Sequence, residues 1–168
     1  MNNYIGRDLL NISNKRVQNE LRVYVDKNYN KFIKNDRAHL ISIESDNVNT
    51  MATFLFYVTD DKFTIVKFIF NKNRCYPFCP PDVRLFDTNY HGGLAKLNTN
   101  IMKFEETICL CCKSLLCKNN WYPGKKLNDI FEEIEINIKI KLRILDKKRC
   151  KYVVNKKFGH YVPIEEFL

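Results

Sequence analysis

Two strand-like runs, joined by only two acidic residues, constrain the fold of this 168-residue chain most strongly. The runs are Met51–Thr59 and Lys62–Asn71, with Asp60-Asp61 between them. Both are rich in β-branched and aromatic residues, and so short a connection predicts an antiparallel hairpin. Strand-like runs at 39–44 and 83–86 lie on either side, so the sequence predicts a four-stranded antiparallel meander.

Apolar residues at helical spacing precede the meander. Ser13 or Asn14 can cap a helix that begins near Lys15, because short polar side chains accept hydrogen bonds from the first free backbone amides. A helix beside an antiparallel sheet indicates an α+β fold.

A second helix is expected after the meander. Pro123-Gly124 is a natural entry, and the apolar positions that follow predict a helix over residues 125–137. From Ile134 to Ile144 apolar residues alternate strictly with polar ones, which is the period of a strand. The sequence therefore does not decide whether residues 138–145 form a helix or a strand.

Length and composition indicate a single globular domain. No apolar run approaches the roughly 20 residues needed to cross a bilayer. The N-terminal residues lack a basic start followed by an apolar block and a cleavage site. We therefore expect a soluble intracellular protein, cytoplasmic or nuclear, that is not secreted. Seven cysteines without an export signal favour free thiols, a catalytic thiol or metal ligands over a disulfide framework.

A proline-rich turn after the hairpin is one of five motifs that follow one another along the chain. Proline fixes φ and donates no backbone hydrogen bond, so the turn ends sheet pairing. In this order the motifs resemble the ubiquitin-conjugating enzyme family over about residues 13–137. The motifs are KRVQNEL at 15–21, YPFCPP at 76–81, Tyr90-His91, Ile108-Cys109-Leu110 and Trp121-Tyr122-Pro123.

The resemblance implies a fold and an activity. The implied core, residues 1–137, has an N-terminal helix, a four-stranded antiparallel meander, a long active-site loop and a central helix. A basic, divergent C-terminal segment, residues 138–168, packs on this domain or extends it. Cys109 would carry ubiquitin or a ubiquitin-like modifier as a thioester and pass it to an amine on a substrate or ligase. Sulfur suits this role because a thiol is a fair nucleophile and a thiolate a good leaving group.

The resemblance also assigns supporting and partner-binding residues. Tyr90 and His91 would support the active site, with His91 in a structural role. Lys15 and Arg16 would meet the activating enzyme, or form an ordinary solvated helix face. No cofactor is implied, because only the upstream activating enzyme uses ATP. A third group would face a ubiquitin ligase: Phe78 and Pro123.

Departures from the family pattern keep a second interpretation open. Gly92-Gly93 stands where the family has Pro-Asn, about eight extra residues lie between His91 and Cys109, and about four between Cys109 and Trp121. The family asparagine is thought to stabilise the oxyanion formed during transfer, and losing such a donor typically costs about 10²–10³ in rate. The alternative is a catalytically inactive variant that acts as a protein-binding module. The candidates to replace the asparagine are Asn98, Asn100, Asn119 and Asn120.

The cysteines also permit a zinc site. Cys109 and Cys112 have the spacing of two tetrahedral ligands, and Cys75 with Cys79 could complete the set. Cys111 next to Cys112 is not a usual ligand pattern, and a second pair two residues apart is missing. We therefore assign no metal.

Residues 139–157 account for +8 of the net charge of +9. Residues 139–157 hold nine Lys and Arg residues against the single Asp146. Such a segment attracts nucleic acid, an anionic membrane or an acidic protein, although it can also be a solvated surface. Tyr152 is its only aromatic residue, which argues against a stacking platform for single strands.

Overall fold

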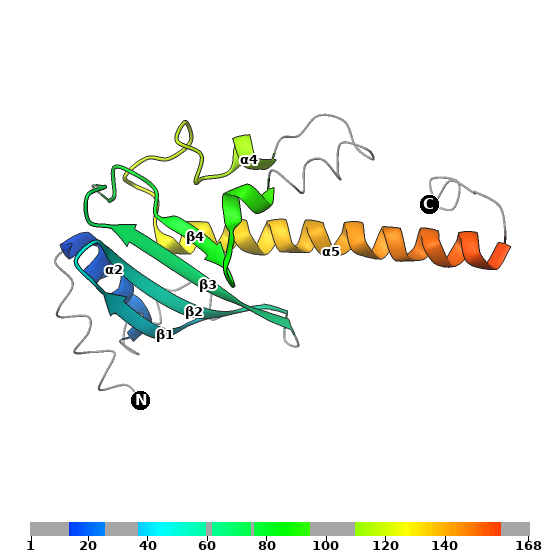
Figure 1. Cartoon of the computed structure of the whole chain (residues 1–168), viewed down its shortest axis with the longest axis horizontal. Coiled ribbons are helices and arrows are strands. Elements are labelled where there is room, and N and C mark those ends of the chain that lie inside the picture. The colour runs from blue at the N-terminus through cyan, green and yellow to red at the C-terminus, as the bar shows by residue number, and fades with distance from the viewer. Residues whose placement is uncertain (1–13, 26–36, 60–61, 75, 95–109, 159–168) are drawn as a thin grey trace.

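The structure is a computed structural model that describes residues 14–25, 37–59, 62–74, 76–94 and 110–158. For residues 144 and 147–158 it describes the backbone and not the side chains. An antiparallel sheet has a short helix and a long helix against it, and the long helix continues well past the sheet (Figure 1). The predicted α+β class is confirmed.

The sheet is a meander of five strands in chain order, not the four that the sequence predicts. The predicted hairpin is confirmed, because Tyr57 pairs with Phe63 and Thr59 with Lys62. The strands are β1 (Ala38–Ser45), β2 (Asn49–Thr59), β3 (Lys62–Asn71), β4 (Asp82–Leu85) and β5 (Thr88–Asn89).

The fifth strand arises from a turn at Phe86, which the sequence places inside the fourth strand. Phe86 has φ of 52°, in the left-handed region, so β4 ends at Leu85 and the chain reverses. The Phe86 N–H still donates to the Ile65 carbonyl of β3 at 2.8 Å. β5 follows with only two residues, a strand too short to show any period in the sequence.

The first described helix, α2 (Lys15–Val25), begins where the sequence predicts. Asn14 is its cap, because the Asn14 Oδ1 accepts from the backbone N–H groups of Arg16 at 3.0 Å and Val17 at 3.2 Å. Val17 and Leu21 are buried against the sheet.

The long helix, α5 (Leu127–Phe158), settles the open question at 138–145 in favour of helix. Ile134 is completely buried while Ile136 is 59% exposed, although a strand would place both on the same face. The Lys126 N–H donates to Asp129 Oδ2 at 2.9 Å and caps the start of the helix. The backbone is then helical without interruption across the expected boundary between 137 and 138.

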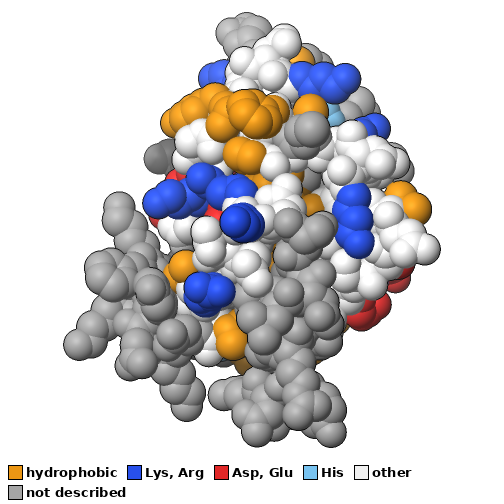
Figure 2. Space-filling view, turned by 90° about the vertical axis from the view of Figure 1, so that its left-hand side faces the viewer, with side chains coloured by type: hydrophobic (Ala, Val, Ile, Leu, Met, Phe, Trp, Pro, Cys, Tyr) orange, Lys and Arg blue, Asp and Glu red, His pale blue; other side chains and the backbone are white. Residues whose placement is uncertain are grey.

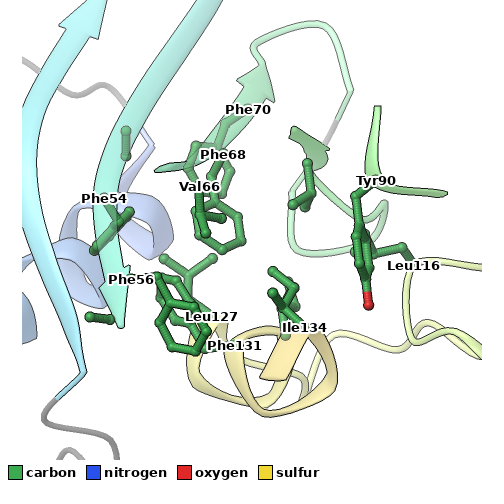
Figure 3. Close-up of a cluster of buried hydrophobic side chains, with 14 of the residues drawn as sticks. Phe54, Phe56, Val66, Phe68, Phe70, Tyr90, Leu116, Leu127, Phe131 and Ile134 are labelled. Atoms are coloured by element: carbon green, nitrogen blue, oxygen red, sulfur yellow. The ribbon is translucent and has the colours of Figure 1, made fainter. Parts of the chain in front are cut away.

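The core lies between the inner face of the sheet and the two helices. Phe131 of α5 is at its centre, with ring centroids 5.1–5.2 Å from those of Phe54, Phe56 and Phe68 (Figure 3). Edge-to-face and stacked aromatic pairs at such distances add to the free energy gained by burial. This packing fixes the first third of α5 against β2 and β3.

Candidate functional site

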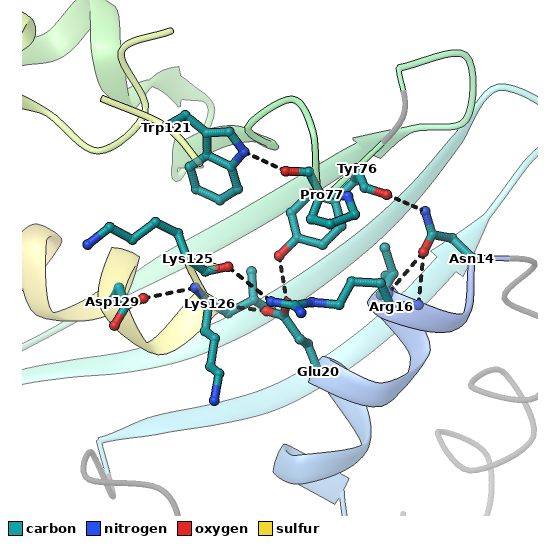
Figure 4. A network of polar contacts seen from close by, with 11 residues as sticks. Asn14, Arg16, Glu20, Tyr76, Pro77, Trp121, Lys125, Lys126 and Asp129 are labelled. Atoms are coloured by element: carbon teal, nitrogen blue, oxygen red, sulfur yellow. Dashed lines mark hydrogen bonds and ion pairs between the residues drawn. The ribbon is translucent and has the colours of Figure 1, made fainter. Parts of the chain in front are cut away.

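Two loops that are distant in sequence meet at one end of the molecule. The proline turn contains a cis Tyr76-Pro77 peptide bond, and the Trp121 indole N–H donates to the Pro77 carbonyl at 2.7 Å (Figure 4). Tyr76 and Trp121 are both buried. Tyr76 and Trp121, the first aromatic residue of each of two of the five motifs, therefore join these loops and are not themselves exposed.

Glu20 of α2 lies at the centre of this junction. Its Oε1 accepts from the Tyr76 hydroxyl at 2.8 Å and its Oε2 from the Leu127 backbone N–H at 2.9 Å, and Arg16 forms an ion pair with it (Figure 4). The Glu20 side chain is only 11% exposed. One carboxylate thus connects α2, the proline turn and the start of α5.

The two loops also carry exposed aromatic side chains. Phe78 is 74% exposed and Tyr122 is 54% exposed, and Pro123 beside Tyr122 is also exposed. Lys125 Nζ lies 5.0 Å from the centre of the Tyr122 ring. Figure 2 shows hydrophobic side chains gathered on this end of the molecule with Lys and Arg side chains beside them. We call Phe78, Tyr122 and Pro123 the aromatic loop surface.

The two basic residues expected to meet an activating enzyme differ in their surroundings. The Arg16 guanidinium is held by Glu20 and by a hydrogen bond of 3.2 Å to the Lys125 carbonyl. Lys15 is exposed and has no ion-pair partner among the described residues. Within the described part of the chain, Lys15 is therefore the more accessible of the two.

Tyr90 and His91 lie beside the segment that follows Cys109. Residues 90–94 are helical, and His91 Nε2 lies 3.0 Å from the carbonyl oxygen of Cys111 in α4 (Leu110–Lys113). Cys109 itself lies outside the described residues. The structure thus brings the predicted supporting histidine to within two positions of the predicted nucleophile.

A second carboxylate, Glu133 of α5, fixes the same segment from the other side. Glu133 Oε1 accepts from the Ser114 hydroxyl at 2.7 Å and the Tyr90 hydroxyl at 3.1 Å, and its Oε2 accepts from the Leu115 N–H at 2.5 Å. Asn137 Nδ2 donates to the Tyr90 hydroxyl oxygen at 2.6 Å. Burial raises the pKa of Tyr90 well above its usual value, and the negative charge of Glu133 adds to this shift.

Of the four asparagines that could replace the family's oxyanion donor, the structure describes two. Asn120 donates through Nδ2 to the carbonyls of Cys112 at 2.6 Å and Ser114 at 3.1 Å, so its amide is used within the loop. Asn119 is exposed, while Asn98 and Asn100 lie outside the described residues. At Gly92 the backbone N–H donates to Asn89 Oδ1 at 2.7 Å.

The four cysteines considered as zinc ligands, and not assigned to a metal, are described only in part. Cys79 and Cys112 are exposed, and Cys111 and Cys117 are partly buried. No group of three His, Cys, Asp or Glu side chains suited to a metal ion occurs among the described residues. The other two members of the zinc set that we considered, Cys75 and Cys109, lie outside them.

Sequence reasoning missed the polar residues that hold the site together. Glu20, Glu133 and Asn137 lie three positions from Val17, Ile130 and Ile134, on or beside the apolar faces of their helices. A polar side chain within a buried stripe needs internal partners, and this is the signal that could have identified them. The fourth missed residue, Ser114, lies in a loop and gives no such signal.

No helix in the described ranges is both long enough and apolar enough to cross a membrane. In comparisons with known proteins, no family model matches this chain, and neither the curated proteins nor the solved structures contain a significant match.

Proposed function

We propose that this chain is a ubiquitin-conjugating-like protein in which Cys109 carries ubiquitin, or a ubiquitin-like modifier, as a thioester. The observation that carries the proposal is the contact between His91 Nε2 and the Cys111 carbonyl. It brings the Tyr-His motif, from about 20 positions upstream, to the segment that directly follows Cys109. Glu133 supports that segment through Ser114 and Leu115.

The proposed chemistry consists of two acyl transfers. The Cys109 thiolate attacks the thioester carbonyl of the modifier on the activating enzyme, forms a new S–C bond and releases the activating enzyme's thiolate. An amine then attacks the Cys109 thioester, loses a proton to solvent and expels Cys109 as thiolate. A free thiol has a pKa of about 8.5, so only a small fraction of such thiols is ionised at neutral pH. The proposed reaction at Cys109 therefore needs surroundings that favour the thiolate.

The aromatic loop surface supports the proposed partner. The resemblance assigns Phe78 and Pro123 to the face that meets a ubiquitin ligase, and Phe78 is among the most exposed large hydrophobic residues described. The bond from Trp121 to Pro77 holds the two loops together before any partner binds. Aromatic anchors on a rigid support bind with a smaller entropy cost than mobile ones.

A charging assay tests the proposal. The protein is mixed with ubiquitin, activating enzyme and ATP, and the products are separated with and without reducing agent. We expect an adduct of one ubiquitin that reducing agent removes. Cys109→Ala should abolish it, and Cys109→Ser should replace it with an ester that resists reduction.

Matched variants locate the nucleophile. Cys111→Ala, Cys112→Ala and Cys117→Ala should each retain the reducible adduct. An adduct that survives Cys109→Ala but is lost in one of these variants would move the nucleophile to that cysteine.

A protein-binding module without catalysis is the second candidate function. The engagement of the Asn120 amide by two loop carbonyls supports this candidate, because that side chain then has no donor for an oxyanion. It predicts stable binding of ubiquitin or another protein and no thioester. Absence of an adduct from folded protein, with activating enzyme that charges a control, would favour this candidate.

A further inference from the structure

Charge is separated along the length of α5. The first part, 127–138, contains four acidic residues and no basic one, and three of the four lie in Glu132–Glu135. The part from 139 to 157 contains nine Lys and Arg residues and only Asp146 as an acid. Cations near a helix C-terminus interact favourably with the helix dipole, but only within the last turn. Most of these charges lie further from the end and need another explanation.

The basic part of α5 extends beyond the core. Ile138 is the last residue of the helix that packs against the described core. Figure 1 shows the helix continuing past the edge of the sheet as a single straight rod. At about 1.5 Å per residue, the 19 residues from 139 to 157 measure about 28 Å.

The three basic side chains that the structure describes on this rod are exposed. Lys139 pairs with Glu135 at 2.5 Å, but Lys141 and Arg143 are exposed and have no ion-pair partner among the described residues. Positions 139, 143, 147 and 151 are all Lys or Arg and lie four apart. Residues at this spacing follow one side of a helix, about 6 Å apart along the axis. The rod therefore presents a row of basic positions along its length.

The distribution of apolar residues disfavours a membrane surface as the ligand. Ile136 is 59% exposed and Leu145 is 44% exposed, and these two residues lie on opposite sides of the helix. A helix that lies in a membrane interface needs one continuous apolar face. Self-association through this segment is also disfavoured, because it would bring two strongly positive rods together.

We propose that residues 139–157 bind the phosphate backbone of duplex DNA, with the helix lying in the major groove and without base specificity. The major groove is about 12 Å wide and admits a single helix of 10–12 Å diameter. The surplus of eight positive charges matches a polyanion, and the single tyrosine at 152 provides no stacking platform for single strands. This proposal does not depend on thioester chemistry at Cys109.

The test measures the anisotropy of a fluorescent duplex DNA titrated with the full chain between about 50 and 200 mM salt. We expect the logarithm of affinity to fall linearly with the logarithm of salt concentration. The slope should be steeply negative. Its magnitude should be at most about 7, the value for neutralising eight phosphates. The triple variant Lys141→Gln, Arg143→Gln, Lys147→Gln should reduce the slope by about 3, because each residue removes about one phosphate contact. Glutamine keeps high helix propensity, and circular dichroism checks that the helix remains.

The matched control has the same change of charge elsewhere: Lys62→Gln, Lys113→Gln, Lys118→Gln. All three lysines are exposed. This control should retain the wild-type slope and affinity. An equal loss in both variants would overturn the proposal, because binding would then follow net charge alone.

Binding of single-stranded DNA and of polyglutamate is compared with binding of duplex DNA. Duplex DNA should bind more tightly than single-stranded DNA and than polyglutamate of matched charge. Equal or tighter binding of polyglutamate would assign the segment to acidic proteins, and tighter binding of single strands would exclude the groove geometry. No binding of duplex at the lowest salt would also overturn the proposal.

Discussion

At the scale of single residues, two carboxylates join the segments of the site through hydrogen bonds. Glu133 accepts from three groups in other segments of the chain, and Glu20 accepts from two such groups and pairs with Arg16 of its own helix. Each buried donor or acceptor that is left without a hydrogen-bond partner lowers the free energy of unfolding by about 1–3 kcal/mol. These carboxylates therefore determine where the loops lie, while the exposed Phe78 and Tyr122 depend on them.

Replacing Glu20 with alanine should destabilise the chain by roughly 2–4 kcal/mol, because the Tyr76 hydroxyl and the Leu127 N–H lose their acceptor inside the protein. Urea unfolding followed by circular dichroism measures the free energy of unfolding. The control is Glu44→Ala, since Glu44 is exposed on β1 and should change stability by no more than about 0.5 kcal/mol. Equal effects of the two variants would show that Glu20 does not stabilise the junction.

Buried tyrosines predict a loss of stability at alkaline pH. Burial raises the pKa values of Tyr24, Tyr76 and Tyr90 above their usual value, and nearby carboxylates add to each shift. Above about pH 10 the unfolded chain releases these protons while the folded chain keeps them. The folded state then binds more protons, so the free energy of unfolding should fall as pH rises above about 10 and be unaffected by these groups below it.

Absorbance of tyrosinate measures this directly. Tyr24, Tyr76 and Tyr90, three of the nine tyrosines in the chain, should form tyrosinate only as circular dichroism reports unfolding. Ionisation of all nine in one step near pH 10, with the fold intact, would contradict the burial of these hydroxyls.

At the scale of elements, the apolar pattern in the sequence of α5 does not by itself identify a helix. The alternation from Ile134 to Ile144 has the period of a strand, but the segment continues a helix that is already capped at Asp129 and packed through Phe131. Once a helix is formed, adding a residue is much easier than starting a new element, and Lys and Glu favour its continuation. The alternation simply distributes isoleucines around the helix.

Paired substitutions in α5 test the helical register. Ile134→Ala should cost about 2–5 kcal/mol, because the side chain is completely buried. Ile136→Ala should cost less than about 0.5 kcal/mol, because that side chain is 59% exposed. A strand would bury both residues on one face, so similar losses in the two variants, measured by urea unfolding, would refute the helix at this point.

The elements with strong local signals could be predicted, and those defined by distant contacts could not. The β2–β3 hairpin and the cap at Asn14 follow from short-range patterns and are confirmed. β5 has only two residues and depends on the left-handed turn at Phe86, which no propensity indicates for phenylalanine. In the site, Tyr90 and His91 could be found as a motif, but their partner Glu133 is 43 positions from Tyr90 and comes from another element.

At the scale of the whole molecule, the described surfaces with distinct chemistry lie far apart. The aromatic loop surface is at the end where the proline turn meets the start of α5, and the basic half of α5 extends from the opposite side (Figure 1). The segment after Cys109 is held between them by Glu133 and His91. A protein ligand on the loops and a polyanion on the helix could therefore be bound at the same time.

Under the proposed function, a change in the aromatic loop surface should weaken ligase-dependent transfer without loss of charging. In Phe78→Ala, the exposed ring is lost while the bond from Trp121 to Pro77 remains, so stability and thioester formation should be unchanged. Discharge to free lysine should also be unchanged, whereas discharge stimulated by a ligase should fall roughly 5- to 30-fold, as expected for the loss of 1–2 kcal/mol at an interface anchor. The matched control is Phe63→Ala, which removes a 58% exposed ring from β3, away from the loops. Equal stimulation of both variants would remove the aromatic loop surface from the ligase interface and leave the thioester chemistry of Cys109 as a separate question.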